Sequence, residues 1–251
     1  MRILLINGNT SPEITERIAV QARRVASHGA EVRAVTAEFG ARLILSRADN
    51  AIAAHAVLAA FARHCGGCDA AVVAVGTDAG LQALRQCAPI PVVGMTEAAL
   101  LTASMIGGKF GLLVFDKRAV PMFREVVAMH GQTDRMAGAV AVPMTPADFA
   151  DPKRVRGEVL GAINRLIEEM AAESVVITGA TTAMLAESLQ RDVSVPLLDG
   201  ISCGVLQTQL LVRLGRPEPR IGNYVGSATQ EYLNVDPAVA ELLRPTEGPK
   251  E

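Results

Sequence analysis

Cys68–Thr77 reads CDAAVVAVGT, and Ala171–Ala180 reads AAESVVITGA. The two stretches align without a gap, and each holds a run of small aliphatic residues that ends in glycine, at Gly76 and Gly179. Such a run predicts a buried strand of a parallel sheet. The repeat itself predicts two halves of similar plan, although strands that end in glycine are common in any α/β protein.

Two further matches flank this pair in the same order. Ile90–Gly94, IPVVG, corresponds to Val195–Asp199, VPLLD, and the chain start Ile3–Asn7 is similar to Gly111–Phe115. Three matched elements in one order favour a true internal repeat. We therefore expect the stretch after about Arg220 to cross back and complete the first half.

The fold class follows from the alternation of short β-branched runs with longer Ala/Leu/Arg segments, which is typical of βαβ units. We predict an α/β fold of two similar parallel-sheet domains related by pseudo-twofold symmetry, with the active-site cleft between them. The first domain takes residues 1–106 plus about 216–251, and the second takes 107–215. The expected strands are Arg2 to Ile6, Glu31 to Ala34, Ala70 to Val75, Val92 to Gly94, Phe110 to Val114, Gly138 to Val142, Ser174 to Thr178 and Leu197 to Leu198.

Composition excludes several partners. The 24 Lys+Arg and 26 Asp+Glu give a net charge of -2 without a basic block, so nucleic acid is not an expected partner. The apolar runs are too short to span a bilayer, so no membrane partner is expected. The first residues lack the features of a signal peptide, which favours a cytoplasmic location.

Neither a cofactor nor a metal is expected. The chain has no GxGxxG or GxxxxGK[ST] pattern for a nucleotide, and its four histidines fall in or near predicted helices. Cys65-Gly66-Gly67-Cys68 has the spacing of a metal or redox motif, but no second pair follows. The alternative is a helix that ends at two glycines, with both cysteines packed as small hydrophobic residues.

Ligands of open parallel sheets lie outside the carboxyl ends of the strands, so we expect a small-molecule substrate among the loops there. Asn7, Asn9, Thr10 and Ser11 form the first loop, before Pro12. Backbone amides at a helix start carry partial positive charge and can bind carboxylate, imide or phosphate oxygens. The alternative is that Thr10 or Ser11 only caps the helix.

Two further loops are expected to face each other across the pseudo-twofold axis. They hold Gly76 and Thr77 on one side, and Gly179, Ala180, Thr181 and Thr182 on the other. Glycine lets the backbone approach a ligand, and the hydroxyls can donate to its oxygens. Thr77 and Thr181 are candidate catalytic residues, although threonine in such loops also caps helices.

Two carboxylates lie near this cleft. Asp78 is a candidate general base, directly or through water, and helix capping is its alternative role. Asp116-Lys117-Arg118 follows another predicted strand, where a cation could neutralise an acidic substrate, or where the three residues could form a solvated turn.

The loops resemble one family. Ile6–Ser11 is similar to the I-N-P-N-T-S opening of the hydantoin/allantoin branch of the aspartate/glutamate racemase superfamily, and Asp78–Leu81 to its D-P-G-L. Val93–Ala99 resembles its V-G-I-x-E-A-A, and Val195–Gly200 its V-P-V-I-D-G. The resemblance covers most of the chain and implies two α/β domains, a cleft between them, no cofactor and association into homo-oligomers.

The resemblance also implies where catalytic cysteines would lie. Racemases of this family place one cysteine at the end of each equivalent strand, because two groups must serve opposite faces of the α-carbon. These positions fall at Val75 or Gly76 and at Gly179 or Ala180, where this chain has no cysteine. Gly76-Thr77 resembles the Gly-Thr-Ser of arylmalonate decarboxylase, a relative that keeps one cysteine at the second position.

Three hypotheses follow from the resemblance and the missing thiols. The first is a racemase-type enzyme that acts on a small carboxylate or a cyclic amide such as a hydantoin, with acid/base work done by Asp78 or another side chain. The second is a lyase or ring-opening hydrolase that uses ordered water held by Thr77, Asp78 and Thr181. The third is a binding protein without catalysis.

Overall fold

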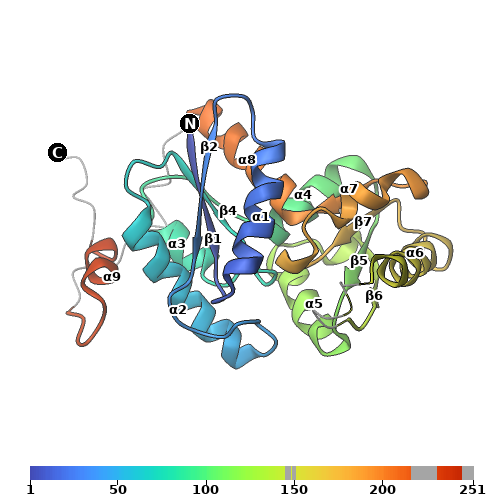
Figure 1. The fold of residues 1–251 in the computed structure, drawn as a ribbon, viewed down its shortest axis with the longest axis horizontal. Coiled ribbons are helices and arrows are strands. Elements are labelled where there is room, and N and C mark those ends of the chain that lie inside the picture. The colour runs from blue at the N-terminus through green and yellow to red at the C-terminus, as the bar shows by residue number, and fades with distance from the viewer. Residues whose placement is uncertain (145–147, 149–150, 216–230, 245–251) are drawn as a thin grey trace.

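The computed structural model describes residues 1–144, 148, 151–215 and 231–244. Within them the chain forms two parallel sheets of four strands each, flanked by helices (Figure 1). The strand order is β2-β1-β3-β4 in the first sheet and β6-β5-β7-β8 in the second. The equivalent orders confirm the predicted α/β class and the predicted pair of similar halves.

The eight strands lie where the sequence predicts them, with small shifts at their ends. They are β1 (Arg2–Asn7), β2 (Glu31–Thr36), β3 (Ala70–Val73), β4 (Val92–Gly94), β5 (Phe110–Val114), β6 (Met136–Ala141), β7 (Ser174–Ile177) and β8 (Leu197–Asp199). The α-helices are α1 (Pro12–Val25), α2 (Arg47–His64), α3 (Leu81–Cys87), α4 (Met95–Ile106), α5 (Val120–Met129), α6 (Pro152–Glu168), α7 (Leu185–Leu189), α8 (Gly200–Leu214) and α9 (Pro237–Leu242).

Helices α4 and α8 cross between the two halves. α4 follows β4 of the first sheet but packs on β7 and β8, whereas α8 follows β8 and packs on β3 and β4. A Cβ atom on Gly200 would lie 2.6 Å from the carbonyl oxygen of Met95, so only glycine permits this close crossing. In the packed structure, therefore, α4 covers the second sheet and α8 covers the first. Chain order alone would place α4 on the first sheet and α8 on the second.

The last described segment, residues 231–244, lies against the first half. Helix α9 packs on α2, and Asp236 at its start accepts a hydrogen bond from Arg63 of α2. Leu242 packs against the core of the first half. Residues 216–230 and 245–251, on which the predicted return of the chain also falls, lie outside the described residues.

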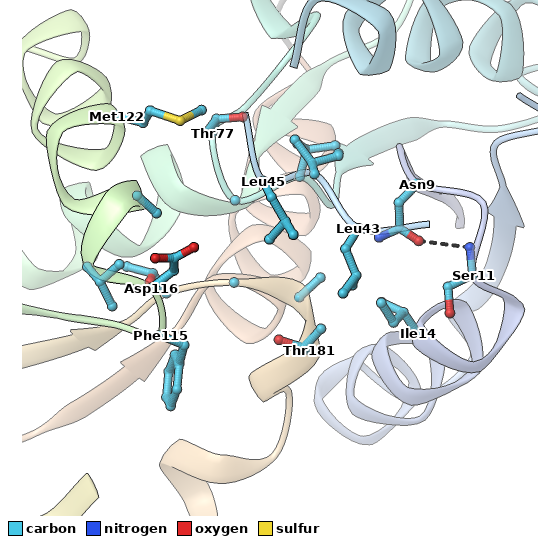
Figure 2. Close-up of a pocket in the computed structure, with 18 of the residues that line it drawn as sticks. Asn9, Ser11, Ile14, Leu43, Leu45, Thr77, Phe115, Asp116, Met122 and Thr181 are labelled. Atoms are coloured by element: carbon cyan, nitrogen blue, oxygen red, sulfur yellow. Dashed lines mark hydrogen bonds between the residues drawn. The ribbon is translucent and has the colours of Figure 1, made fainter. Parts of the chain in front are cut away.

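The carboxyl ends of the strands in both sheets open on a cavity between the halves (Figure 2). Because parallel strands all end at the same edge of a sheet, the loops after β1, β3, β5 and β7 meet there. Among the described residues, no helix is long and apolar enough to cross a membrane.

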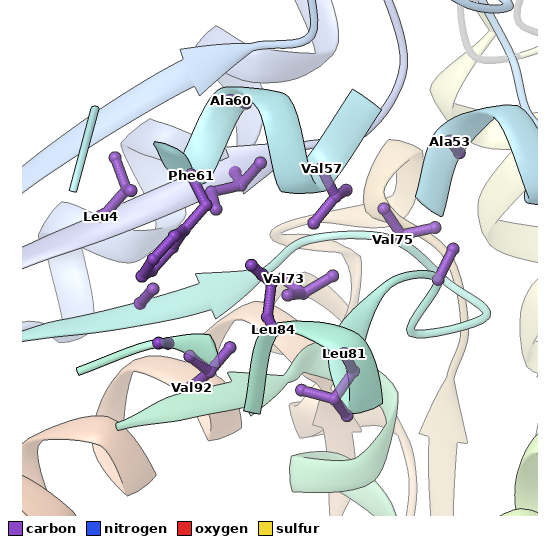
Figure 3. Close-up of a cluster of buried hydrophobic side chains, with 14 of the residues drawn as sticks. Leu4, Ala53, Val57, Ala60, Phe61, Val73, Val75, Leu81, Leu84 and Val92 are labelled. Carbon is purple, nitrogen blue, oxygen red and sulfur yellow. The ribbon is translucent and has the colours of Figure 1, made fainter. Parts of the chain in front are cut away.

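Small aliphatic side chains from strands and helices form the cores. In the first half, Leu4 and Val73 of the sheet pack against Val57 and Phe61 of α2 and Leu84 of α3 (Figure 3). All five are buried, and Phe61 is among the largest fully buried side chains. Burial of such side chains stabilises the fold by about 1.5–3 kcal/mol each. The cores thereby hold the strand ends, and so the cavity loops, in place.

Candidate active site

The cavity has a volume of about 960 Å³ and is lined by both halves. Residues 74–77, after β3, and residues 178–181, after β7, form two of its walls. In Figure 2, Asn9 and Ser11 lie on one side, Asp116 and Phe115 lie on the other, and Leu43 and Leu45 lie between them. Most of the remaining lining is apolar, including Ile14, Ile44, Val114, Met122, Phe123 and Met144.

Gly76 and Gly179 bring the two loops together. A Cβ atom on Gly76 would lie 3.5 Å from the Cα of Gly179 and 3.2 Å from Cζ of Phe123. Gly179 has a φ of +92°, a left-handed conformation that a side chain would strain. The prediction that these loops face each other is therefore confirmed, and Ala180 lines the same cavity.

Thr77 and Thr181 line the cavity from opposite halves (Figure 2). The Thr77 hydroxyl donates to the side-chain oxygen of Asn50 on α2, which fixes its orientation. The main-chain carbonyl of Thr181 accepts a hydrogen bond of 2.8 Å from Arg17 of α1. Thr182, in contrast, is buried and donates to the carbonyls of Thr178 and Gly179, so it shapes the loop and does not line the cavity.

The first loop contributes Asn9 and Ser11 to the cavity. Asn7 is fully buried, and its amide donates to the side chain of Asn9 at 3.0 Å and to the hydroxyl of Thr15 at 2.9 Å. Asn7 therefore holds the loop in place through these hydrogen bonds and does not line the cavity. Thr10 does not line the cavity either, and its backbone amide donates to the carbonyl of Ala41 at 3.0 Å. Of the four binding residues predicted in this loop, Asn9 and Ser11 line the cavity, and Asn7 and Thr10 do not.

Asp78 does not line the cavity, which corrects its predicted role as general base. Its side chain is fully buried and accepts hydrogen bonds from the amides of Thr96, at 3.0 Å, and Glu97, at 2.7 Å. His130 Nε2 lies 3.1 Å from the same carboxylate. These partners show that Asp78 caps the start of α4, the alternative that the sequence left open.

A buried charge network surrounds Asp78. His130, at the end of α5, lies between Asp78 and Glu97, and Arg85 of α3 forms an ion pair with Glu97. Burial disfavours the charged imidazole, but the two carboxylates outweigh it and raise the pKa of His130 to about 9. Burial likewise opposes the charge of Glu97, yet hydrogen bonds from His130 and Arg85 lower its pKa to about 2. The sequence offered no signal for this network, because His130 is far from Asp78 along the chain.

Charged residues of the cavity rim were largely missed by sequence reasoning. Arg17 and Glu13 come from α1, and Arg42 comes from the loop between β2 and α2. Asp116 and Arg118 come from the cluster after β5 that the sequence singled out. Hydrogen bonds from the side chain and the backbone of Arg118 lower the pKa of Asp116, so this carboxylate is ionised at neutral pH.

None of the four cysteines lines the cavity. Burial raises the pKa of Cys87 and of Cys203 to about 11, so both are protonated at neutral pH. Cys65 ends α2, and the amide of Cys68 donates to its carbonyl at 2.9 Å, a turn that matches the packing alternative. Among the described residues, no three histidine, cysteine, aspartate or glutamate side chains form a group that could hold a metal.

Paired parallel sheets with a cavity between their carboxyl ends define the class: an α/β fold of two similar halves with a small-molecule cavity between them. The sequence matches the Asp/Glu/Hydantoin racemase family over residues 3–208, so the chain belongs to that family. Membership makes it a racemase-like enzyme, in the isomerase class.

Individual relatives agree with the family. The allantoin racemase from Klebsiella pneumoniae has a TM-score of 0.89 and 30% identity, covering 96% of this chain and 98% of its own. The allantoin racemase from Pseudomonas fluorescens has the same TM-score and 31% identity, covering 93% and 100%. The hydantoin racemase from Pseudomonas sp. (strain NS671) is 29% identical over 235 residues, 93% of this chain and 94% of its own. Arylmalonate decarboxylase, at 12% identity and a TM-score of 0.60, shares the fold.

Proposed function

We propose that this chain is a cofactor-independent enzyme that acts on a small cyclic amide of the hydantoin type, or on a related small carboxylate, with acid/base groups other than cysteine. The names of its relatives, hydantoin racemase and allantoin racemase, support the substrate class. The residues that line the cavity support acid/base groups other than cysteine.

The approach of Gly76 to Gly179 carries this proposal. The two loops come from different halves and bring Thr77 and Thr181 to the same cavity. A flat ring with carbonyl oxygens and N-H groups can be held between such walls by hydroxyls and backbone amides. The apolar side chains around them leave room for a ring substituent.

Proton transfer then falls to a carboxylate. Glu13 and Asp116 are the carboxylates that line the cavity in the described part of the chain. The Asp116 side chain is 26% exposed and that of Glu13 is 72% exposed. Asp116 is the more enclosed of the two, so we assign it as the acceptor of the substrate proton, and water that enters the cavity returns a proton to the opposite face of the α-carbon.

The same cavity favours a second candidate, a lyase or ring-opening hydrolase. Neither Gly76 nor Gly179 has a side chain that can return a proton from the opposite face. Thr77 and Thr181 can instead hold a water molecule, which Asp116 can activate. Such an enzyme would form a new product without inverting the substrate.

Proton NMR in deuterium oxide tests the proposal, with a panel of hydantoins, allantoin, acidic amino acids and substituted malonates. Exchange or inversion at the α-carbon supports racemisation, and D116N is then expected to lower the rate at least about a hundredfold. New products without exchange would assign the lyase or hydrolase. Binding without turnover on the whole panel would contradict catalysis and leave the binding protein.

A further inference from the structure

The three arginines that line the cavity differ in their partners. Arg42 lies 3.7 Å from the carboxylate of Glu13, and Arg118 lies 3.0 Å from that of Asp116. In the described part of the chain, no carboxylate lies within ion-pair distance of Arg17. The charged lining therefore holds three cations and two anions, with the extra positive charge on Arg17.

The position of Arg17 makes this charge available to a ligand. Arg17 lies on α1, one turn beyond Ile14, and both residues line the cavity. Glu13 is four residues earlier and could have paired with it, but the carboxylate of Glu13 contacts the Ser11 hydroxyl and Arg42 instead. One guanidinium nitrogen of Arg17 donates to the carbonyl of Thr181, and no acceptor for its other N-H groups lies among the described residues.

That single hydrogen bond also aims the guanidinium. It joins α1 of the first half to the loop after β7 of the second half, beside Gly179 and Thr181. A guanidinium oriented by one hydrogen bond can present a planar pair of donors to a carboxylate. Arg17 is exposed, so its free N-H groups are accessible to a ligand that enters the cavity.

We propose that Arg17 binds a carboxylate of the substrate and so determines specificity for anionic substrates. The inference rests on the proposed function, because it concerns the same cavity. It narrows the substrate class to a cyclic amide whose substituent carries a carboxylate, or to an open-chain analogue with a carboxylate at the same place. The alternative is that Arg17 only fastens the loop of Thr181.

Matched acid and amide probes separate these roles. The probes are hydantoin-5-acetic acid and hydantoin-5-acetamide, which share one ring and differ in charge, together with succinate and succinamate as an open-chain pair. Calorimetry gives their Kd values for the wild type, R17Q and R17K. The control is R23Q, since Arg23 lies on the same helix, pairs with Glu16 and does not line the cavity.

We expect the wild type to bind the acid of a pair at least about tenfold more tightly than the amide. R17Q should remove this preference with little change in the Kd of the amide, R17K should keep part of it, and R23Q should keep all of it. If R17Q weakens acid and amide equally, Arg17 only fastens the loop and the inference is overturned.

The two pairs also separate this inference from the proposed function. Equal binding of the two hydantoins by the wild type would overturn the inference and leave the cyclic-amide substrate intact. Binding of succinate alone, lost in R17Q, would reject the cyclic amide and uphold the role of Arg17. Failure of all four probes to bind would overturn the role of Arg17.

Discussion

Gly76 and Gly179 meet at the strand ends where the family resemblance places a pair of thiols, at Val75 or Gly76 and at Gly179 or Ala180. Neither glycine has a side chain that can carry a proton. The close approach explains why small residues are needed there. Any added side chain on Gly76 would press on Phe123 or on the opposite loop. The proposed function therefore takes its acid/base group from another lining residue, Asp116.

For Asp78, the sequence predicted a position near the cleft but not the role of the side chain. Its place after β3, next to Thr77, predicted a general base in the cleft, but its side chain is buried and accepts hydrogen bonds from α4. The hydrogen bonds from α4 show what the side chain does instead. Whether a carboxylate faces a cavity or a helix start cannot be read from its neighbours in sequence.

Replacement of Asp78 by Asn should therefore act on stability. The change leaves the positive charge of His130 with one buried carboxylate fewer and directs an amide N-H group toward backbone donors. We expect the free energy of unfolding to fall by about 3 kcal/mol. Urea unfolding measures it, with D116N as the control that should unfold like the wild type. An unchanged D78N stability with a selective loss of turnover would restore Asp78 as a catalytic residue.

At the scale of elements, the sequence predicted all eight strands because each is a short aliphatic run bounded by glycine, proline or charge. It also predicted the loops after β1, β3, β5 and β7, because parallel strands share one functional edge. The loop between β2 and α2 was missed, although its Arg42, Leu43 and Leu45 line the cavity. Such an irregular loop has no periodicity to reveal which side chains turn inward.

The contact between α5 and α4 makes stability depend on pH. The ordinary histidine pKa of 6.5 is raised to about 9 at His130, so its contribution is complete below pH 6.5 and is lost as the pH rises toward 9. We expect the free energy of unfolding to fall by up to about 3 kcal/mol over this range. Glu97, with a pKa lowered from 4.5 to about 2, acts in the opposite direction, and its contribution is lost as the pH falls below 4.5.

Denaturant unfolding at a series of pH values checks this prediction. H130Q should flatten the decline between pH 6.5 and 9, whereas H28Q, the same change at an exposed histidine, should not. A decline of the same size in H130Q would show that other groups set the pH dependence.

At the scale of the whole molecule, the internal repeat predicted two halves with a cavity between them, because similar hydrophobic runs build similar sheets. The exchange of α4 and α8 was not predictable in the same way. Both helices follow their own strand along the chain, and only packing shows that each covers the sheet of the other half. This crossing ties the two cavity walls together, so the halves hold Gly76 against Gly179 as one unit.

We propose that this cavity works without a cysteine. The most direct measurement is the rate of α-proton exchange in deuterium oxide, on whichever substrate of the panel reacts, for the wild type and for a variant with Cys65, Cys68, Cys87 and Cys203 all changed to alanine. A thermal melt confirms that the variant is folded. We predict a rate within about threefold of the wild type, because all four thiols lie outside the cavity. Loss of exchange in the folded cysteine-free variant would contradict the account.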